Sequence, residues 1–130
     1  MKKLIAIFTI TYLLMALPIL AIAQTFHPAD QKTIAWEAAE RATFYRIYVK
    51  PATGGDEVLL GETEATQYTA TMPSEGRWYI GVESVRVVDG EEVGTSAISW
   101  SSDPAVCMDG EAFGVIFFEP PGAASGLRAQ

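Results

Sequence analysis

The stretch that decides the fold is "TFYRIYVK" at residues 43–50, together with "RWYIGVESVRVVDG" at residues 77–90. In both stretches apolar and aromatic side chains recur at every second position. One face carries Tyr45, Ile47 and Val49 in the first stretch, and Trp78, Ile80 and Val82 in the second. A period of two, rich in β-branched and aromatic residues, is typical of a half-buried β-strand. Both stretches are therefore predicted strands.

Shorter runs of the same kind follow on either side, separated by turn residues such as Asp89-Gly90. We predict further strands at residues 32–36, 57–62, 66–72, 95–101 and 112–118. No stretch after residue 24 sustains the helical period of 3.6. The helix-favouring piece "WEAAERATFY" is short and bounded by strand chemistry, so it is predicted as a strand end and a loop. The sequence thus predicts an all-β sandwich of about seven strands.

Residues 1–23 are interpreted as a secretory signal peptide. Lys2 and Lys3 precede an apolar run that ends at Ala21-Ile22-Ala23, a pattern of small residues typical of a cleavage site. The alternative is an uncleaved membrane anchor, because the apolar run is long enough to span a bilayer of about 30 Å. The two lysines hold the N-terminus inside in either case, so the remainder is expected to be secreted or periplasmic. If the signal is cleaved, no stable membrane insertion is expected.

The part expected to be exported is one small acidic domain. Without residues 1–23 the chain has 107 residues, with seven basic and sixteen acidic ones and a net charge of −9. Such a charge repels phosphate backbones, so nucleic acid is excluded as an expected partner. Cys107 is the only cysteine and cannot pair within the chain. It is interpreted as a small buried hydrophobe, with an intermolecular bridge as the alternative.

The order of these anchors resembles a fibronectin type III domain, a family with an immunoglobulin-like fold. The resemblance rests on Ile34 and Trp36, "YRIYV", "YTATMP", "WYIGVESV" and "GTSAIS", and covers roughly residues 30–101. It implies a domain over residues 24–119, Greek-key connections, and Trp36 at the centre of the core. The short "MKK" start is in keeping with a bacterial source.

Two features depart from the family pattern. Trp78 stands where the family usually has a Tyr whose hydroxyl bonds to the preceding corner, so its indole nitrogen, or Tyr79 in a shifted register, must supply that bond. The stretch "DPAVCMDGEAFGVIFF" follows the expected last strand. We expect residues 112–118 to form an extra strand that extends the sheet; the alternative is a last strand displaced by a long loop.

The residue inventory predicts no enzyme and no cofactor. His27 lies near the expected mature N-terminus, and Cys107 has acidic neighbours that raise its pKa. Asp103, Asp109 and Glu111 could offer oxygen ligands to calcium, but their spacing is not that of a calcium loop, so no metal site is predicted. The remaining carboxylates are interpreted as solvated charges that keep the domain soluble.

The predicted site is a surface. Phe44, Tyr48 and Tyr79 alternate away from the core face and are expected to form an exposed aromatic patch for a partner. Alternatively, the extra strand or a neighbouring domain covers them. We expect a non-enzymatic module that acts as a structural spacer or protein-interaction domain. The alternative is a carbohydrate- or surface-binding adhesion module using these aromatics.

The tail "PPGAASGLRAQ", residues 120–130, has the composition of a linker. In sequence it resembles the start of a further repeat of the same family, which would make a neighbouring repeat domain a partner. A frayed terminus is the other interpretation.

Overall fold

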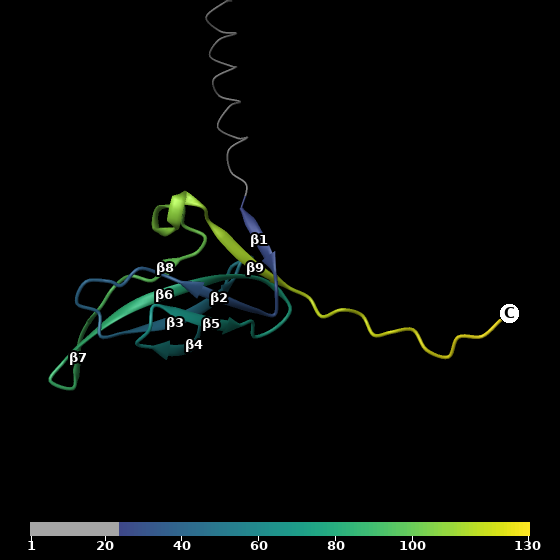
Figure 1. Ribbon diagram of the computed structural model, residues 1–130, viewed down its shortest axis with the longest axis horizontal. Coiled ribbons are helices and arrows are strands. Elements are labelled where there is room, and N and C mark those ends of the chain that lie inside the picture. Colours follow the sequence, from purple (N-terminus) through teal and green to yellow (C-terminus); the bar gives the residue numbers. More distant parts are fainter. Residues whose placement is uncertain (1–23) are drawn as a thin grey trace, which may run out of the picture.

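Strands β3 (Phe44–Pro51) and β6 (Gly76–Val88) pair antiparallel at the centre of the larger of two sheets in this computed structural model. The structure describes residues 24–130, so the predicted signal peptide lies outside the described residues. Seven strands form the large sheet and two form the small one (Figure 1). The all-β prediction is confirmed.

The other elements are short. The remaining strands of the large sheet are β1 (Thr25–Pro28), β4 (Val58–Thr63), β7 (Glu91–Thr95), β8 (Ser99–Trp100) and β9 (Phe113–Phe117). The small sheet consists of β2 (Gln31–Ala35) and β5 (Gln67–Thr71). Two single-turn 3-10 helices, η2 (Pro104–Val106) and η3 (Met108–Gly110), lie between β8 and β9. The piece at residues 36–43 is irregular, as predicted.

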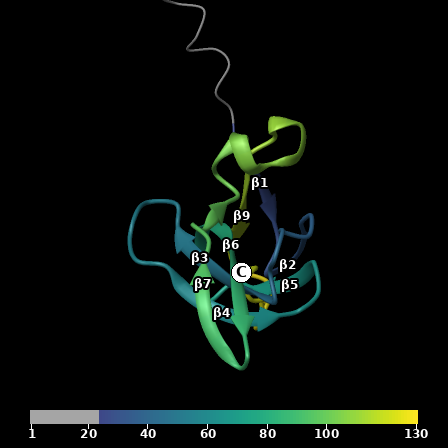
Figure 2. The same cartoon turned by 90° about the vertical axis from the view of Figure 1, so that its left-hand side faces the viewer.

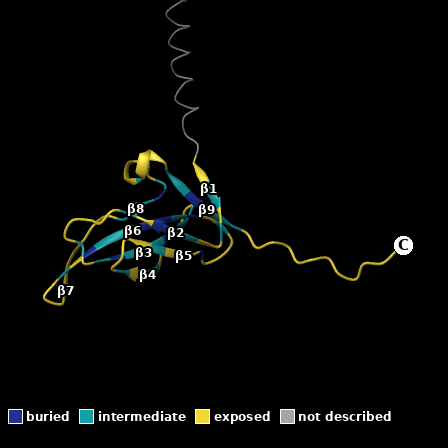
Figure 3. Cartoon of the chain, viewed as in Figure 1, coloured by how far each residue is buried: buried dark blue, intermediate teal, exposed yellow. Residues whose placement is uncertain are grey.

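The core lies between the two sheets. Figure 3 shows the course of buried and exposed segments along the chain. Alternate residues of β3 are buried, and Ile47 and Val49 are fully buried. From β6 and β9, Ile80 and Val115 join them, and the small sheet contributes Ile34, Ala70 and Met72. This alternation matches the period of two in the sequence, because successive side chains of a strand point to opposite faces.

Strand β6 is long enough to pair with three successive segments along one edge. Its last residues pair with β7, Gly81 and Val82 pair with β8, and its first residues pair with β9. Asp89 and Gly90 both have positive φ, of 52° and 80°, and make the tight turn to β7 that the sequence predicted.

A strand forms at residues 113–117, within the range predicted for it. It extends the large sheet along the edge of β6 that β7 and β8 begin, which agrees both with an added strand and with a displaced last strand. The backbone N–H of Phe113 donates to the carbonyl of Ser101 (2.8 Å), which closes residues 102–112 into a loop. This loop protrudes at one end of the sandwich (Figure 2). Strand β1 then pairs parallel with β9 and becomes the outermost strand on that side.

Trp36 and Trp78 differ in how deeply they are buried. Trp36 is only partly buried and packs edge-on against Tyr45 at the border of the core, so its placement at the core centre is wrong. Trp78 is buried, and its Nε1–H donates to the carbonyl of Ser74 (2.9 Å). The indole therefore makes the corner bond, and Tyr79 does not.

Residues 119–130 are fully exposed, and this tail runs away from the sandwich (Figure 1). Leu127 in it is 87% exposed. Across residues 24–130 we find no helix of the length and apolarity that crossing a membrane requires.

Candidate functional site

The three aromatics predicted as a binding patch lie on the outer face of the large sheet, and each is half-buried. Phe44 lies opposite Val85 on β6, whereas Tyr48 lies opposite Gly81. Tyr79 packs its ring on Phe26 (5.7 Å between ring centroids). The structure therefore spreads Phe44, Tyr48 and Tyr79 along the sheet and does not bring all three into one bare surface.

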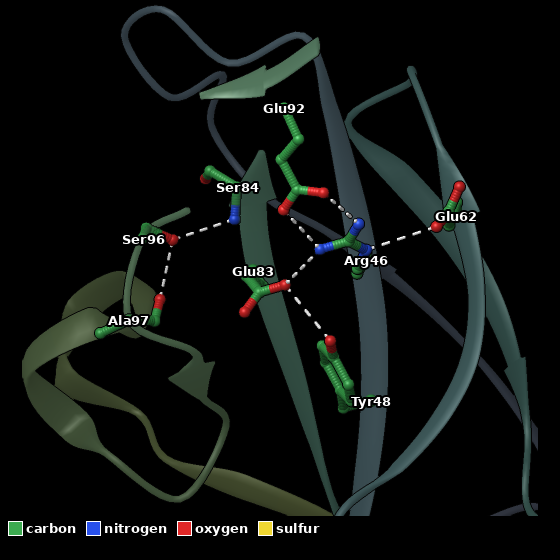
Figure 4. A network of polar contacts seen from close by, with 8 residues as sticks. All are labelled: Arg46, Tyr48, Glu62, Glu83, Ser84, Glu92, Ser96 and Ala97. Carbon is green, nitrogen blue, oxygen red and sulfur yellow. Dashed lines mark hydrogen bonds and ion pairs between the residues drawn. The ribbon is translucent and has the colours of Figure 1, made fainter. Parts of the chain in front are cut away.

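Arg46 lies between Phe44 and Tyr48 along β3, and Figure 4 shows its polar contacts with Glu62, Glu83 and Glu92. Its guanidinium donates to Glu62 (3.3 Å), to Glu83 (3.3 Å) and, through two nitrogens, to Glu92 (3.1 and 2.9 Å). The carbon of the same group lies 5.4 Å from the centre of the Phe44 ring. Arg46 thus ties β3 to β4, β6 and β7 and covers one of the predicted aromatics.

Ionisation on this face follows from these contacts. Hydrogen bonding to Glu92 and the other carboxylates raises the pKa of Arg46, which therefore stays charged. The guanidinium in turn lowers the pKa of Glu92. Burial and the carboxylate of Glu83 raise the pKa of Tyr48, whose hydroxyl donates to Glu83 (3.2 Å). The network holds its polar groups in fixed, mutually satisfied states.

Two further rings on the outer face carry cations. Lys50 places its Nζ 4.2 Å from the ring centre of Trp100, and the Arg77 guanidinium carbon lies 5.7 Å from that of Phe26. Cation–π contacts of this kind occupy the ring faces that a flat ligand would stack on. The sequence analysis did not assign these pairs, although the alternation of aromatic and basic residues in "FYRIYVK" carries part of the signal.

The inner face of the large sheet is open on the side of β2. A cavity of about 750 Å³ lies there between β2 and the loop of residues 102–112. Its floor is the inner face of β3 and β6, with Tyr45, Ile80 and Val82. Its walls are the end of β2 on one side and β8 with the loop on the other. We call this feature the β2 groove.

Backbone groups of β2 and one side-chain nitrogen lack hydrogen-bond partners at the β2 groove among the described residues. Strand β2 pairs only with β5, so its other edge has no neighbouring strand among the described residues. The indole Nε1 of Trp36, which lines the groove, is buried and finds no hydrogen-bond acceptor in the described part of the chain. A buried donor left without an acceptor is uncommon in folded proteins. The sequence analysis missed this groove, because it arises from distant strands.

The rim of the β2 groove is apolar on the loop side. Val106 is 51% exposed and Met108 is 77% exposed, and both line the opening. Cys107 between them is half-buried and its Sγ donates to the carbonyl of Ser101 (3.4 Å). Burial raises the pKa of this thiol, and Asp103 raises it further. The direction agrees with the prediction made from the acidic neighbours of Cys107. Such a thiol is a poor nucleophile at neutral pH.

The other residues considered for chemistry do not form a site. Asp103 accepts the N–H of Ala105 (3.0 Å) as a cap of η2. Within residues 24–130 no group of three His, Cys, Asp or Glu side chains could hold a metal ion. The position of His27 near the N-terminus suggested a mobile segment. His27 instead lies in β1, half-buried, with its ring edge-on to Phe113.

Comparison with known proteins gives no relative of this chain. No family model, no curated protein and no solved structure matches it.

Proposed function

We propose that this protein is an exported, non-enzymatic β-sandwich module of fibronectin type III type that works as a protein-interaction domain. The observation that carries the proposal is the β2 groove, where an apolar opening of about 750 Å³ adjoins an unpaired strand edge. Apolar concave surfaces with a few unsatisfied polar groups are typical of binding sites. Export is supported by the pattern of residues 1–23, and the family assignment by the strand anchors in the sequence.

A role as a passive spacer needs no such groove, because a spacer needs only a rigid body and two ends. The carbohydrate-binding alternative depends on bare aromatic faces on the outer side of the large sheet. Arg46 lies against the predicted Phe44 ring (5.4 Å from its centre), and Lys50 and Arg77 lie against two other rings of this face, those of Trp100 (4.2 Å) and Phe26 (5.7 Å). The outer face therefore supports glycan stacking less well than the β2 groove supports a protein partner.

Site-directed photo-crosslinking in the native cell tests the interaction role. A photoreactive residue in place of Met108, on the rim of the β2 groove, is expected to form protein adducts of discrete mass. The matched control carries the same residue in place of Val88, which is 40% exposed near the tip of β6. Adducts at neither position would contradict an interaction role, and equal adducts at both would contradict the groove as the site.

The same material tests export. Cleavage after Ala23 predicts a mature chain that begins at Gln24, which intact-mass measurement on the extracytoplasmic fraction detects directly. A full-length mass in the cytoplasm would contradict this part of the proposal.

A further inference from the structure

We propose that the β2 groove binds an extended segment of the partner protein by β-strand addition to the free edge of β2. The segment has apolar residues at alternate positions and at least one basic residue at its end. This inference rests on the proposed interaction role and specifies its geometry. Four observations carry it: the register of β2, the shape of the groove, the unpaired Trp36 indole, and the charge of the rim.

The register of β2 leaves one set of backbone groups free. The N–H of Trp36 donates to Thr66 and the N–H of Met72 donates to Asp30. Hydrogen-bonded and non-hydrogen-bonded pairs alternate along an antiparallel ladder, and the register pairs Thr33 with Thr69. The N–H and C=O groups directed away from β5 are therefore those of Gln31, Thr33 and Ala35. These are the groups that an added strand would pair with.

The side chains of an added strand would divide between solvent and groove. A strand extends the sheet at a spacing of about 4.8 Å, and its alternate side chains point to one face. On the inner side of β2 that face looks onto Tyr45, Ile80 and Val82. Tyr45 and Ile80 are already buried, so residues of the partner at every second position would pack on the half-buried Val82, and the exposed Val106 and Met108 would contact them from the loop.

Trp36 supplies a specific reason for a peptide over an apolar small molecule. Its indole Nε1–H is buried beside the groove without an acceptor. A peptide chain carries a carbonyl oxygen at every residue, so it can accept the hydrogen bonds of the β2 edge, and that of the Trp36 indole after its ring turns to face the groove. A hydrocarbon ligand would leave all of these groups unpaired.

The charge of the groove's rim favours a partner segment with a basic residue at its end. Glu37 and Glu111 line the groove, and among residues 24–130 no Lys, Arg or His lines it. The chain as a whole carries a net charge of −7. A second copy of the same chain would bring like charge to the interface, whereas a segment with a terminal lysine or arginine would be attracted. We therefore assign the site to a different protein.

Selection from a peptide library tests the proposal on the purified exported chain. The library has nine-residue peptides with apolar residues at alternate positions and lysine at one end. A second library holds the same residues with the apolar ones clustered. We expect enrichment from the alternating library only. This enrichment should persist after the peptides that also bind the Ala35→Pro variant have been removed. Proline at an exposed edge position removes the outward N–H and leaves the β2–β5 ladder intact.

Three measurements on the selected peptides decide the mode. Binding should fall at least tenfold with Ala35→Pro and stay within twofold with Ala35→Ser, which keeps the N–H at the same exposed position. N-methylation of the peptide amides that face β2 should abolish binding, and methylation of the other amides should not. Hydrogen exchange at Gln31, Thr33 and Ala35 should slow on binding, and the Trp36 indole resonance should shift.

The second and third of these measurements need no change in the protein, so misfolding of the proline variant cannot hide the answer. No enrichment of alternating over clustered peptides would overturn strand addition, and so would binding that survives N-methylation of the amides that face β2. Protection of the β2 edge in the free protein, together with a dimeric mass, would assign the site to a second copy. If crosslinks at Met108 persist while strand addition fails, the interaction role stands and only its geometry is wrong.

Discussion

The outer and inner faces of the large sheet both carry aromatic and apolar side chains, but these side chains have different surroundings on the two faces. On the outer face, cations lie against the rings of Phe44, Trp100 and Phe26. One of these cations, Arg46, also forms ion pairs with carboxylates of β4, β6 and β7. On the inner face the apolar side chains of β3 and β6 are buried, apart from Val82 beside the β2 groove, which is half-buried.

The contrast teaches where a binding surface arises in a small sandwich. A row of outward aromatics is not sufficient evidence, because the same strands place basic residues next to them and the rings become covered. Within residues 24–130 the small sheet has two strands, and β1 pairs with β9 on the other sheet, so no described strand lies beside the free edge of β2. A sheet that lacks a strand exposes both apolar floor and unpaired backbone, which are the two requirements for strand addition.

The largest expected effect separates the two faces at adjacent residues. Ile47→Ala removes a fully buried side chain from the inner face and should destabilise the fold by about 2–5 kcal/mol. Tyr48→Ala acts on the half-buried outer face and should cost less, about 1–2 kcal/mol. Chemical denaturation of both variants measures the difference. Equal losses would show that the outer face is packed as a second core.

A glycine tests how tightly the outer face is covered. A Cβ on Gly81 would lie 2.6 Å from Cγ2 of Ile98 and 2.7 Å from Cε3 of Trp100. Gly81→Ala should therefore force Trp100 off the sheet and cost about 1–3 kcal/mol. The control is Gly94→Ala on β7, where a Cβ meets nothing within 4 Å and the change should stay below about 0.5 kcal/mol. Near-ultraviolet circular dichroism follows the displaced indole. An unchanged Trp100 signal and stability would mean that this cover is loose.

The pair of core-facing tryptophans tests the β2 groove. Trp78→Phe removes the donor to Ser74 and some packing, and should cost about 1–2 kcal/mol. Trp36→Phe removes an indole N–H that has no acceptor, so its cost should stay below about 1 kcal/mol. The free energy of unfolding of each variant in urea gives the comparison. A loss from Trp36→Phe as large as that from Trp78→Phe would show that the Trp36 indole has a partner in solution.

Local pattern was sufficient for most of the strands but not for the site. The alternation in β3, the inward Trp78 and the Asp89-Gly90 turn all depend on residues close in sequence, and each was predicted correctly. Pairing between distant segments was not. The edge on which β9 lies depends on contacts between residues 76–78 and 115–117, which no local pattern encodes.

The surroundings of the predicted aromatics were missed for the same reason. Phe44, Tyr48 and Tyr79 do point outward, but the cation that covers the first of them is held by Glu92, forty-six positions from Arg46. Likewise, the alternation of Trp36 with Ile34 in the sequence predicts that Trp36 is a core residue. Its position at the border of an open groove follows only from the absence of a strand beside β2 among the described residues.

The smallest expected effect concerns the ion pair that holds β7 to the outer face. Glu92→Gln should lower the melting temperature slightly at neutral pH and speed amide exchange in β7, because the bidentate contact with Arg46 weakens. Arg46 lowers the pKa of Glu92, so the contribution of this pair is present above the ordinary Glu value of 4.5 and is lost as the pH falls through the depressed value. The wild type and the variant should therefore converge below that value, and added salt should narrow the gap at neutral pH.

Glu91 is the matched control for this prediction, since it is the exposed neighbour of Glu92 on β7 and makes no ion pair within residues 24–130. Glu91→Gln should leave both the melting temperature and its pH dependence unchanged. A difference between Glu92→Gln and the wild type that persists at acidic pH would mean that the carboxylate acts through packing, and that the outer face is covered by side-chain contacts independent of its charge. Because β7 is exposed at every residue, its attachment to the sheet depends on the backbone ladder with β6 and on this pair. Exchange in β7 is therefore the most sensitive measure of how firmly the outer face is closed.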